Sequence, residues 1–171
     1  MKNTIIKFNR KKILINVLGS ILISGLLLFI LYESIMEFNI IAVILSLLSF
    51  LFFICIFIYS IYIFATDKPA IIITDDGITD NSNMFGVGFV SWRLIKHSAL
   101  INHPNYVWLS LYVHDIESIL STNLSSITRE VVKLNFKFYK SPIILSMTFC
   151  NWDAKVLQDE IQKHIQYYKD K

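Results

Sequence analysis

Two long apolar segments near the N-terminus dominate the hydrophobic pattern of this chain. Residues 13–32 contain no charged side chain, and residues 40–64 contain none either. An uncharged apolar segment of this length is typical of a transmembrane helix, because about 20 residues span the hydrocarbon core of a bilayer. The short connection at residues 33–39 would make the two helices antiparallel neighbours. The pattern therefore predicts a transmembrane helical hairpin over residues 13–64.

Two other interpretations of the first apolar segment fit less well. A cleaved signal peptide would have a shorter apolar run followed by a small-residue cleavage site, and neither feature is present. A soluble helical hairpin is the other interpretation, but two uncharged apolar segments of this length would be very unusual in a soluble domain. We therefore expect the lipid bilayer to surround both helices.

The charges that flank the apolar segments predict their orientation. Five basic residues and no acidic residue precede the first segment, whereas the connection contains Glu33 and Glu37 and no basic residue. Lys and Arg near the ends of a membrane span favour the cytoplasmic side. We expect a basic cytosolic N-terminus at residues 1–12, a linker at 65–69 and a cytosolic domain at 70–171. The predicted location is the bacterial inner membrane, with both termini in the cytoplasm.

Small side chains recur along both apolar segments and predict where the helices pack. Small residues let helix backbones approach closely in lipid, where the hydrophobic effect does not drive association. The candidate packing residues are Ser20, Ser24, Gly25, Ala42, Ser46 and Ser49. The same stripe could pair with a second copy of the chain, so a homo-oligomer through the transmembrane helices is a further expectation.

Short β-strands are predicted through most of the region after the hairpin. The expected strands cover 70–74, 78–82, 85–92, 94–101, 107–113, 131–139 and 142–148. In the sixth, Val132, Leu134, Phe136 and Phe138 alternate with polar residues, which is typical of a half-buried strand. An Asp-Gly pair, Asp76 followed by Gly77, predicts a hairpin turn between the first two. Residues 115–129 are expected to form an inserted helix or loop.

An amphipathic helix is predicted at the C-terminus. Leu157, Ile161, Ile165 and Tyr168 form one apolar stripe, and Asn151 is a candidate N-cap. Seven antiparallel strands followed by one such helix outline a pleckstrin-homology-like (PH-like) barrel whose open end is capped by the helix. The predicted fold class is therefore α+β, with a transmembrane hairpin followed by this seven-stranded barrel.

Several local motifs carry a resemblance to a known family. They are residues 69–74 (PAIIIT), 76–78 (DGI), 88–92 (GFVSW) with Ile95, and 141–143 (SPI). In these motifs the chain resembles a bacterial family of small two-span membrane proteins with a cytosolic PH-like domain. The resemblance covers most of the chain, but its motifs are turns, strand starts and core positions. It implies a fold and supplies no active-site residue.

The residues that commonly carry catalysis do not form a recognisable motif. The chain has a net charge of +3 and contains no nucleophile elbow, phosphate-binding glycine loop or metal-spaced Cys/His cluster. Asp75 and Asp76 are adjacent, but a tight turn explains them better than paired acid–base chemistry. We expect no enzyme activity, no catalytic residue, no cofactor and no metal. The basic segment at residues 7–12 is too short to predict nucleic-acid binding.

One predicted strand offers a candidate surface for a protein partner. If the Leu109 side of the strand at 107–113 points inward, then Trp108, Tyr112 and His114 point outward. Exposed aromatic side chains on one strand suit protein recognition. The alternative is that residues 115–129 fold over them, and the sequence favours that alternative because exposed apolar patches are uncommon.

Two functions remain open at this point. The first is a membrane-anchored, non-enzymatic binding or scaffold protein that holds an unidentified protein partner at the cytoplasmic face of the membrane. The second is an immunity protein that protects against a secreted, membrane-targeting antibacterial toxin, which the resemblance to the two-span family implies as an alternative.

Overall fold

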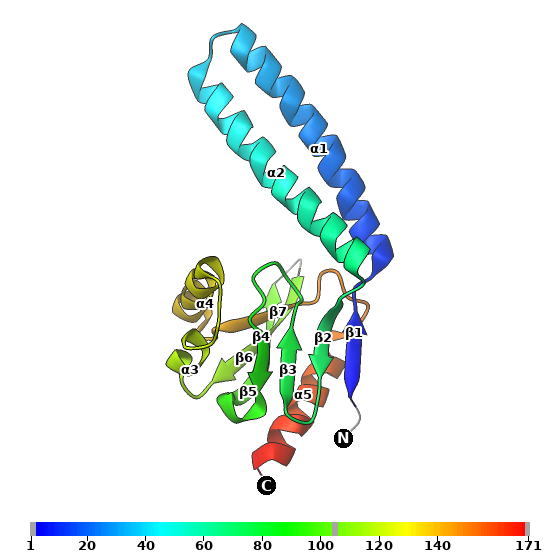
Figure 1. Cartoon of the computed structure of the whole chain (residues 1–171), viewed down its shortest axis with the longest axis vertical. Helices are drawn as coiled ribbons and strands as arrows, with labels where there is room; N and C mark the ends of the chain where they lie inside the picture. The colour runs from blue at the N-terminus through cyan, green and yellow to red at the C-terminus, as the bar shows by residue number, and fades with distance from the viewer. Residues whose placement is uncertain (1–2, 104–105, 170–171) are drawn as a thin grey trace. The chain divides into compact units, whose positions relative to one another are not determined.

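A computed structural model describes residues 3–103 and 106–169 and has an α+β architecture (Figure 1). The chain divides into two compact units. One is a helical hairpin, Asn9–Asp67. The other, here called the β-rich unit, combines the segment ending at Phe8 with the chain from Lys68 onward.

The hairpin consists of two helices of equal length, α1 (Arg10–Met36) and α2 (Ile40–Thr66). Both are long and apolar enough to cross a membrane. Asn9 caps α1 by accepting hydrogen bonds from the backbone N–H groups of Lys11 and Lys12, at 2.9 and 3.3 Å. Asn39 caps α2 in the same way through the N–H of Ala42. The two predicted apolar helices are therefore present, each extended by a few residues beyond its uncharged segment.

The first sheet of the β-rich unit has four antiparallel strands in the order β1–β2–β3–β4. The strands are β1 (Thr4–Lys7), β2 (Pro69–Ile73), β3 (Gly77–Asp80) and β4 (Gly88–Ser91). A short 3-10 helix, η1 (Trp92–Leu94), follows β4. Gly77 does not have a positive φ. Any Cβ at that position would lie 2.3 Å from the carbonyl oxygen of Val90, so close strand packing requires the glycine.

The edge strand β1 was not predicted, because its residues were interpreted only as a basic N-terminus. β1 pairs with β2, with Ile6 opposite Ile71, and both side chains are buried. The hairpin is thus inserted between two neighbouring antiparallel strands. Both of its ends connect to the same end of one sheet.

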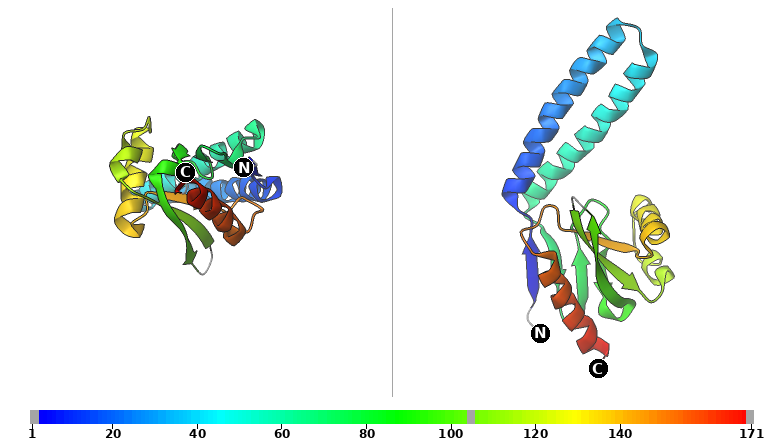
Figure 2. Two further views of the ribbon diagram at one scale, coloured as in Figure 1. Left: turned by 90° about the horizontal axis from the view of Figure 1, so that it is seen from below. Right: turned by 180° about the vertical axis from the view of Figure 1, so that it is seen from behind.

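The second sheet has three antiparallel strands in the order β5–β6–β7. They are β5 (Ile95–His103), β6 (Tyr106–Val113) and β7 (Ile143–Ser146). The C-terminal helix α5 (Ala154–Lys169) packs against β5, β6 and η1, and Figure 2 shows it alongside the strands. One hydrophobic core joins both sheets and α5, with Leu109, Ile143 and Leu157 at its centre.

The prediction of a closed seven-stranded barrel is wrong, because the described strands form two separate sheets. The sixth expected strand, 131–139, is instead part of helix α4 (Ser126–Tyr139), which follows the short helix α3 (Ile116–Leu120). Ser125 caps α4 through the N–H of Thr128. The predicted C-terminal helix is present, but Asp153 rather than Asn151 caps it, through the N–H groups of Lys155 and Val156.

Candidate functional site

The contact between α1 and α2, here called the serine seam, is lined mainly by small polar side chains. The buried residues of α1 are Ile13, Ser20, Ser24 and Ser34, and those of α2 are Ser46, Ser60 and Ile63. A hydrogen bond crosses the seam: the side-chain amide of Asn16 donates to the hydroxyl of Ser60 at 2.8 Å. Small side chains allow the close approach of two helices that lack a hydrophobic driving force.

Most seam hydroxyls are satisfied within their own helix. Ser34, Ser46 and Ser60 each donate to the carbonyl oxygen four residues earlier, at 2.7–2.8 Å. Ser20 donates to the carbonyl of Val17. This bonding lets a hydroxyl sit in an apolar environment without an unpaired donor. The hydroxyl of Ser24 is the one buried seam oxygen, among the described residues, without such a partner.

The structure places the predicted packing residues at different depths. Ser20, Ser24 and Ser46 lie in the serine seam, and Ala42 and Ser49 are partly buried. Gly25 is exposed, and a Cβ added there would meet no atom within 4 Å, so Gly25 lies outside the contact. Sequence reasoning missed Asn16, Ser34 and Ser60. Asn16 carried a usable signal, since an amide within a membrane span needs a partner.

The outward faces of the hairpin are almost wholly apolar. The exposed side chains include Leu22, Phe29, Ile41, Leu48 and Phe52, each at least 60% accessible. At the base of the hairpin, Arg10 forms an ion pair with Asp67 at 3.2 Å and lies 5.7 Å from the ring centroid of Phe64. Charge is therefore confined to the ends of this unit, and the surface between them is apolar.

The candidate partner surface is only partly open. Trp108 is half-buried and its ring meets that of Tyr139 on α4 edge to face, with centroids 6.1 Å apart. Tyr112 is also half-buried and stacks on His97 of the neighbouring strand, at 4.3 Å. His114 is exposed. The covering element at Trp108 is thus α4, which had been interpreted as a strand, rather than residues 115–129.

A surface cavity of about 290 Å³ lies beside Trp108. Its lining residues are Asn83, Trp108, Val131, Asn135, Tyr139, Ile144 and Ser146. The lining residues include two with amides, two with hydroxyl groups and two with aromatic rings, and the cavity volume is near the lower end of the range for small-ligand pockets. It offers hydrogen-bond partners and stacking surfaces rather than a carboxylate, thiol or imidazole.

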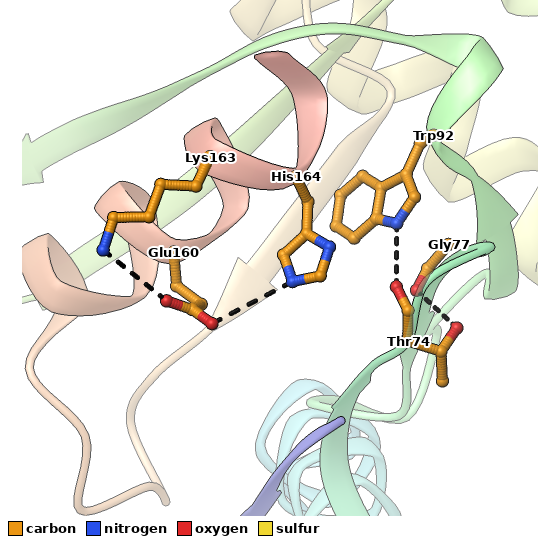
Figure 3. A network of polar contacts seen from close by, with 6 residues as sticks. All are labelled: Thr74, Gly77, Trp92, Glu160, Lys163 and His164. Atoms are coloured by element: carbon orange, nitrogen blue, oxygen red, sulfur yellow. Dashed lines mark hydrogen bonds and ion pairs between the residues drawn. The ribbon is translucent and has the colours of Figure 1, made fainter. Parts of the chain in front are cut away.

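A buried histidine joins α5 to η1 (Figure 3). The His164 ring stacks on Trp92, with centroids 5.1 Å apart, and its Nε2 lies 3.9 Å from Glu160. The Trp92 indole donates to the carbonyl of Thr74 at 2.9 Å. Burial lowers the pKa of His164 below its ordinary value, while Glu160 opposes that change. His164 is therefore a neutral core side chain at neutral pH.

A buried carboxyl group ties the two sheets together. Asp80 accepts hydrogen bonds from the backbone N–H and the hydroxyl of Ser82, at 2.9 and 2.7 Å. The Ser82 hydroxyl in turn accepts from the N–H of Ser146 on the second sheet. Burial raises the pKa of Asp80, although these hydrogen bonds lower it in part. The contacts of Asp80 serve the connection between the sheets.

Comparison of the chain with known protein families, curated proteins and solved structures finds no match. In the described part of the chain, no group of three or more His, Cys, Asp or Glu residues is placed to hold a metal ion. The interpretation of function therefore depends on the geometry of this chain, above all on the contrast between the serine seam and the apolar outer surface of the hairpin.

Proposed function

We propose that this chain is a membrane-anchored, non-enzymatic binding or scaffold protein. The hairpin is the anchor, and the β-rich unit is the part presented to a protein partner in the cytoplasm. One observation carries the proposal: the hairpin buries serines and exposes large apolar side chains. A soluble hairpin would show the opposite distribution.

The cost of leaving this surface in water supports lipid as its surroundings. Fully burying one Leu, Ile or Phe side chain is worth about 1.5–3 kcal/mol. The hairpin exposes many such side chains with no charged residue among them in the middle of either helix. Within a bilayer the same side chains face hydrocarbon, and the backbone groups are satisfied inside the helices.

The pairing of β1 with β2 supports one side of the membrane for both ends of the chain. The two strands are hydrogen-bonded neighbours, and the hairpin is inserted between them. A hairpin that crosses the membrane twice and connects to one sheet at both ends returns the chain to the side of the membrane that it left. The basic residues Lys7, Arg10, Lys11 and Lys12 favour the cytoplasm for that side.

The part presented to a partner is best placed around Trp108 and Tyr139. Their rings border the cavity of about 290 Å³, and Asn83 and Asn135 bring amides to its wall. Trp and Tyr are enriched among the residues that contribute most to protein–protein binding. His114 is exposed just after the end of β6, the strand that carries Trp108. A Trp108→Ala variant that still folds is expected to lose a partner captured by crosslinking with the full-length chain in cells.

Topology mapping tests the anchor. A reporter that is active only in the cytoplasm, fused after Lys171, should be active, and the same reporter inserted at Phe38 should be inactive. The chain should remain with the membrane after alkaline washing. Recovery of the intact chain in the soluble fraction without detergent, or activity of the reporter at Phe38, would overturn the proposal.

A further inference from the structure

Helix α4 has apolar side chains on two faces, and only one of them packs on the core. Thr128 and Val132 are buried, whereas Ile127, Leu134 and Phe138 are exposed. The three exposed positions are separated by seven and four residues, so they share one stripe on the helix surface. Phe138 is 69% accessible and Leu134 is 50% accessible. Such a stripe on a folded domain indicates an interaction surface.

The charge next to this stripe is basic. Residues 126–140 include Arg129, Lys133, Lys137 and Lys140 against the single acidic residue Glu130. Lys133 forms an ion pair with Glu130 at 2.7 Å. An amphipathic helix with Phe and Leu on one face and lysines beside it is typical of helices that lie in the interface of an anionic bilayer. The same charge disfavours a second copy of this chain, because two basic surfaces repel each other.

The connection between β3 and β4 brings two more apolar side chains to the same region. Asn83 of this connection lines the cavity with Asn135 and Tyr139 of α4, and its amide donates to the carbonyl of Ile144 at 3.4 Å. The next two residues, Met84 and Phe85, are exposed.

The connection has a fixed shape. The N–H of Phe85 donates to the Asn83 side chain at 2.8 Å. A Cβ at Gly86 would lie 2.5 Å from the carbonyl oxygen of Asp80, so the chain is tightly packed there. Met84 and Phe85 are therefore held outward by a defined turn.

The connection between β3 and β4 lies at one end of the first sheet. It is the end at which the chain enters β2 after leaving α2. The N–H of Asn81, which begins the same connection, donates to the carbonyl of Ala70 at 2.8 Å, and its side chain donates to Pro69. Figure 1 shows α4 and this connection at the end of the β-rich unit where β2 begins. Only Asp67 and Lys68 separate Pro69 from the last residue of α2. Three Cα–Cα steps span at most about 11 Å, so the chain tethers this end of the sheet to the end of α2.

We propose that this end of the β-rich unit is a second membrane-contact surface, specific for anionic lipid. Leu134, Phe138, Met84 and Phe85, here called the apolar contact set, enter the interfacial layer of the leaflet. Lys137 and Lys140 bind lipid phosphates at its edge. The inference rests on the proposed function, because the hairpin must lie in a bilayer for the β-rich unit to be held near lipid. Lipid composition then controls whether this end of the β-rich unit contacts the membrane.

Tryptophan quenching by brominated acyl chains tests this in the full-length chain. The chain is placed in nanodiscs of phosphatidylcholine alone or of equal parts phosphatidylcholine and phosphatidylglycerol. Phe138→Trp and Phe85→Trp introduce reporters in the apolar contact set, and the emission of the parent chain is subtracted. Both reporters should lose most of their emission in brominated anionic nanodiscs and much less in zwitterionic ones.

Two matched reporters make the outcomes distinguishable. Phe52→Trp lies on the exposed face of α2 and should be quenched in every brominated nanodisc. Tyr167→Trp lies near the C-terminal end of α5, which Figure 1 shows at the opposite end of the β-rich unit from the start of β2, and this reporter should not be quenched. Loss of quenching at Phe52→Trp would overturn the membrane anchor itself. Quenching at Phe52→Trp without quenching at Phe138→Trp would overturn only the second contact.

Charge neutralisation tests the lipid phosphates. Lys137→Gln and Lys140→Gln are made in the Phe138→Trp background. Each should lower the equilibrium constant for contact between the β-rich unit and anionic nanodiscs about fivefold, so that quenching falls toward the level seen in zwitterionic nanodiscs. Rising salt should have the same effect. A reporter that shifts to shorter wavelength but is not quenched by bromine would indicate a protein or a second copy as the occupant, and would overturn the lipid assignment.

Discussion

In the hairpin the buried positions are mostly serines, whereas in the β-rich unit they are mostly Ile, Leu and Val. The exposed positions differ in the opposite sense: Leu48 and Phe52 lie on the surface of α2, and Lys155 and Asp159 lie on the surface of α5. One chain therefore contains two distributions of apolar side chains. The distribution in the hairpin is the one expected for helices surrounded by lipid, and the distribution in the β-rich unit is the one expected for a domain surrounded by water.

The difference also changes which forces hold each unit together. In the β-rich unit, burial of apolar area drives folding and polar groups are tolerated where they are paired, as Asp80 is with Ser82. In a bilayer, the apolar area of the proposed anchor is not buried on folding, so close packing at the serine seam and the bond between Asn16 and Ser60 matter more. The same substitution should accordingly have unequal effects in the two units.

Truncating an apolar side chain should damage only the β-rich unit. Ile161→Ala removes a fully buried side chain from α5 and is expected to cost about 2–5 kcal/mol of unfolding free energy. Ile44→Ala, at an exposed position of α2, should leave the unfolding of the β-rich unit unchanged. Denaturant titration of the detergent-solubilised chain, followed by tryptophan fluorescence, measures both, because Trp92, Trp108 and Trp152 all lie in the β-rich unit. Equal losses in the two variants would contradict the comparison.

Introducing a charge should damage only the hairpin. Leu48→Lys places an ammonium group on the outer surface of α2 and is expected to cost about 2.5–3.5 kcal/mol of membrane insertion. Val156→Lys, at a similarly exposed position of α5, should be near neutral. The fraction of chain that resists alkaline extraction reports the effect. If Leu48→Lys integrates as well as the parent chain, lipid does not surround α2.

The hairpin could be predicted from sequence because its signal is local. A long uncharged segment needs no tertiary information to be interpreted as a membrane helix. Helix α4 could not, because Leu134, Phe136 and Phe138 are exposed apolar residues that create an alternating pattern. The helical pattern of Thr128, Val132, Asn135 and Tyr139 was present but weaker in apolar character. If the apolar contact set binds lipid, two of the misleading residues, Leu134 and Phe138, are functional ones, as local rules often fail at functional sites.

Strand β1 and part of the serine seam required knowledge of distant partners. Thr4–Lys7 is short, and its partner β2 is separated from it by the whole hairpin. Nothing local distinguishes Ile6 as a core residue until that pairing is known. Gly25 and Ser24 are equally small, yet only Ser24 faces the other helix. Helix rotation in the membrane depends on packing, which the small-residue pattern alone did not define.

Acid should weaken the β-rich unit through His164. Because burial lowers the pKa of His164, the unfolded chain binds more protons than the folded chain as pH falls through 6.5. Stability is therefore lost from that pH downward, until the folded-state pKa is passed. His164→Phe keeps a ring against Trp92 but does not titrate, so its unfolding free energy should fall less between about pH 7.5 and about pH 5.

Parallel denaturant titrations of the parent chain and His164→Phe at each pH measure this difference. Glu160 and Asp75 also influence His164, so Glu160→Gln serves as a control for the Glu160 carboxylate, which lies 3.9 Å from the Nε2 of His164. That control should lose stability with acid at least as steeply as the parent chain, because it removes the group that raises the pKa of His164. Equal pH dependence in the parent chain and His164→Phe would show that His164 does not titrate in this range.

The smallest expected effect is at the hydrogen bond across the serine seam. Ser60→Ala removes the acceptor of the Asn16 amide and should cost about 0.6 kcal/mol, the average for such bonds between membrane helices. Ser49→Ala is the matched control, since the Ser49 hydroxyl donates only to Leu45 of its own helix. Sodium dodecyl sulfate titration in mixed micelles, with Phe52→Trp as reporter, measures the hairpin. A double-mutant cycle of Ser60→Ala and Asn16→Ala should give a coupling energy of about 0.6 kcal/mol. A coupling energy near zero would mean that side-chain packing, and not this hydrogen bond, stabilises the contact between the two helices.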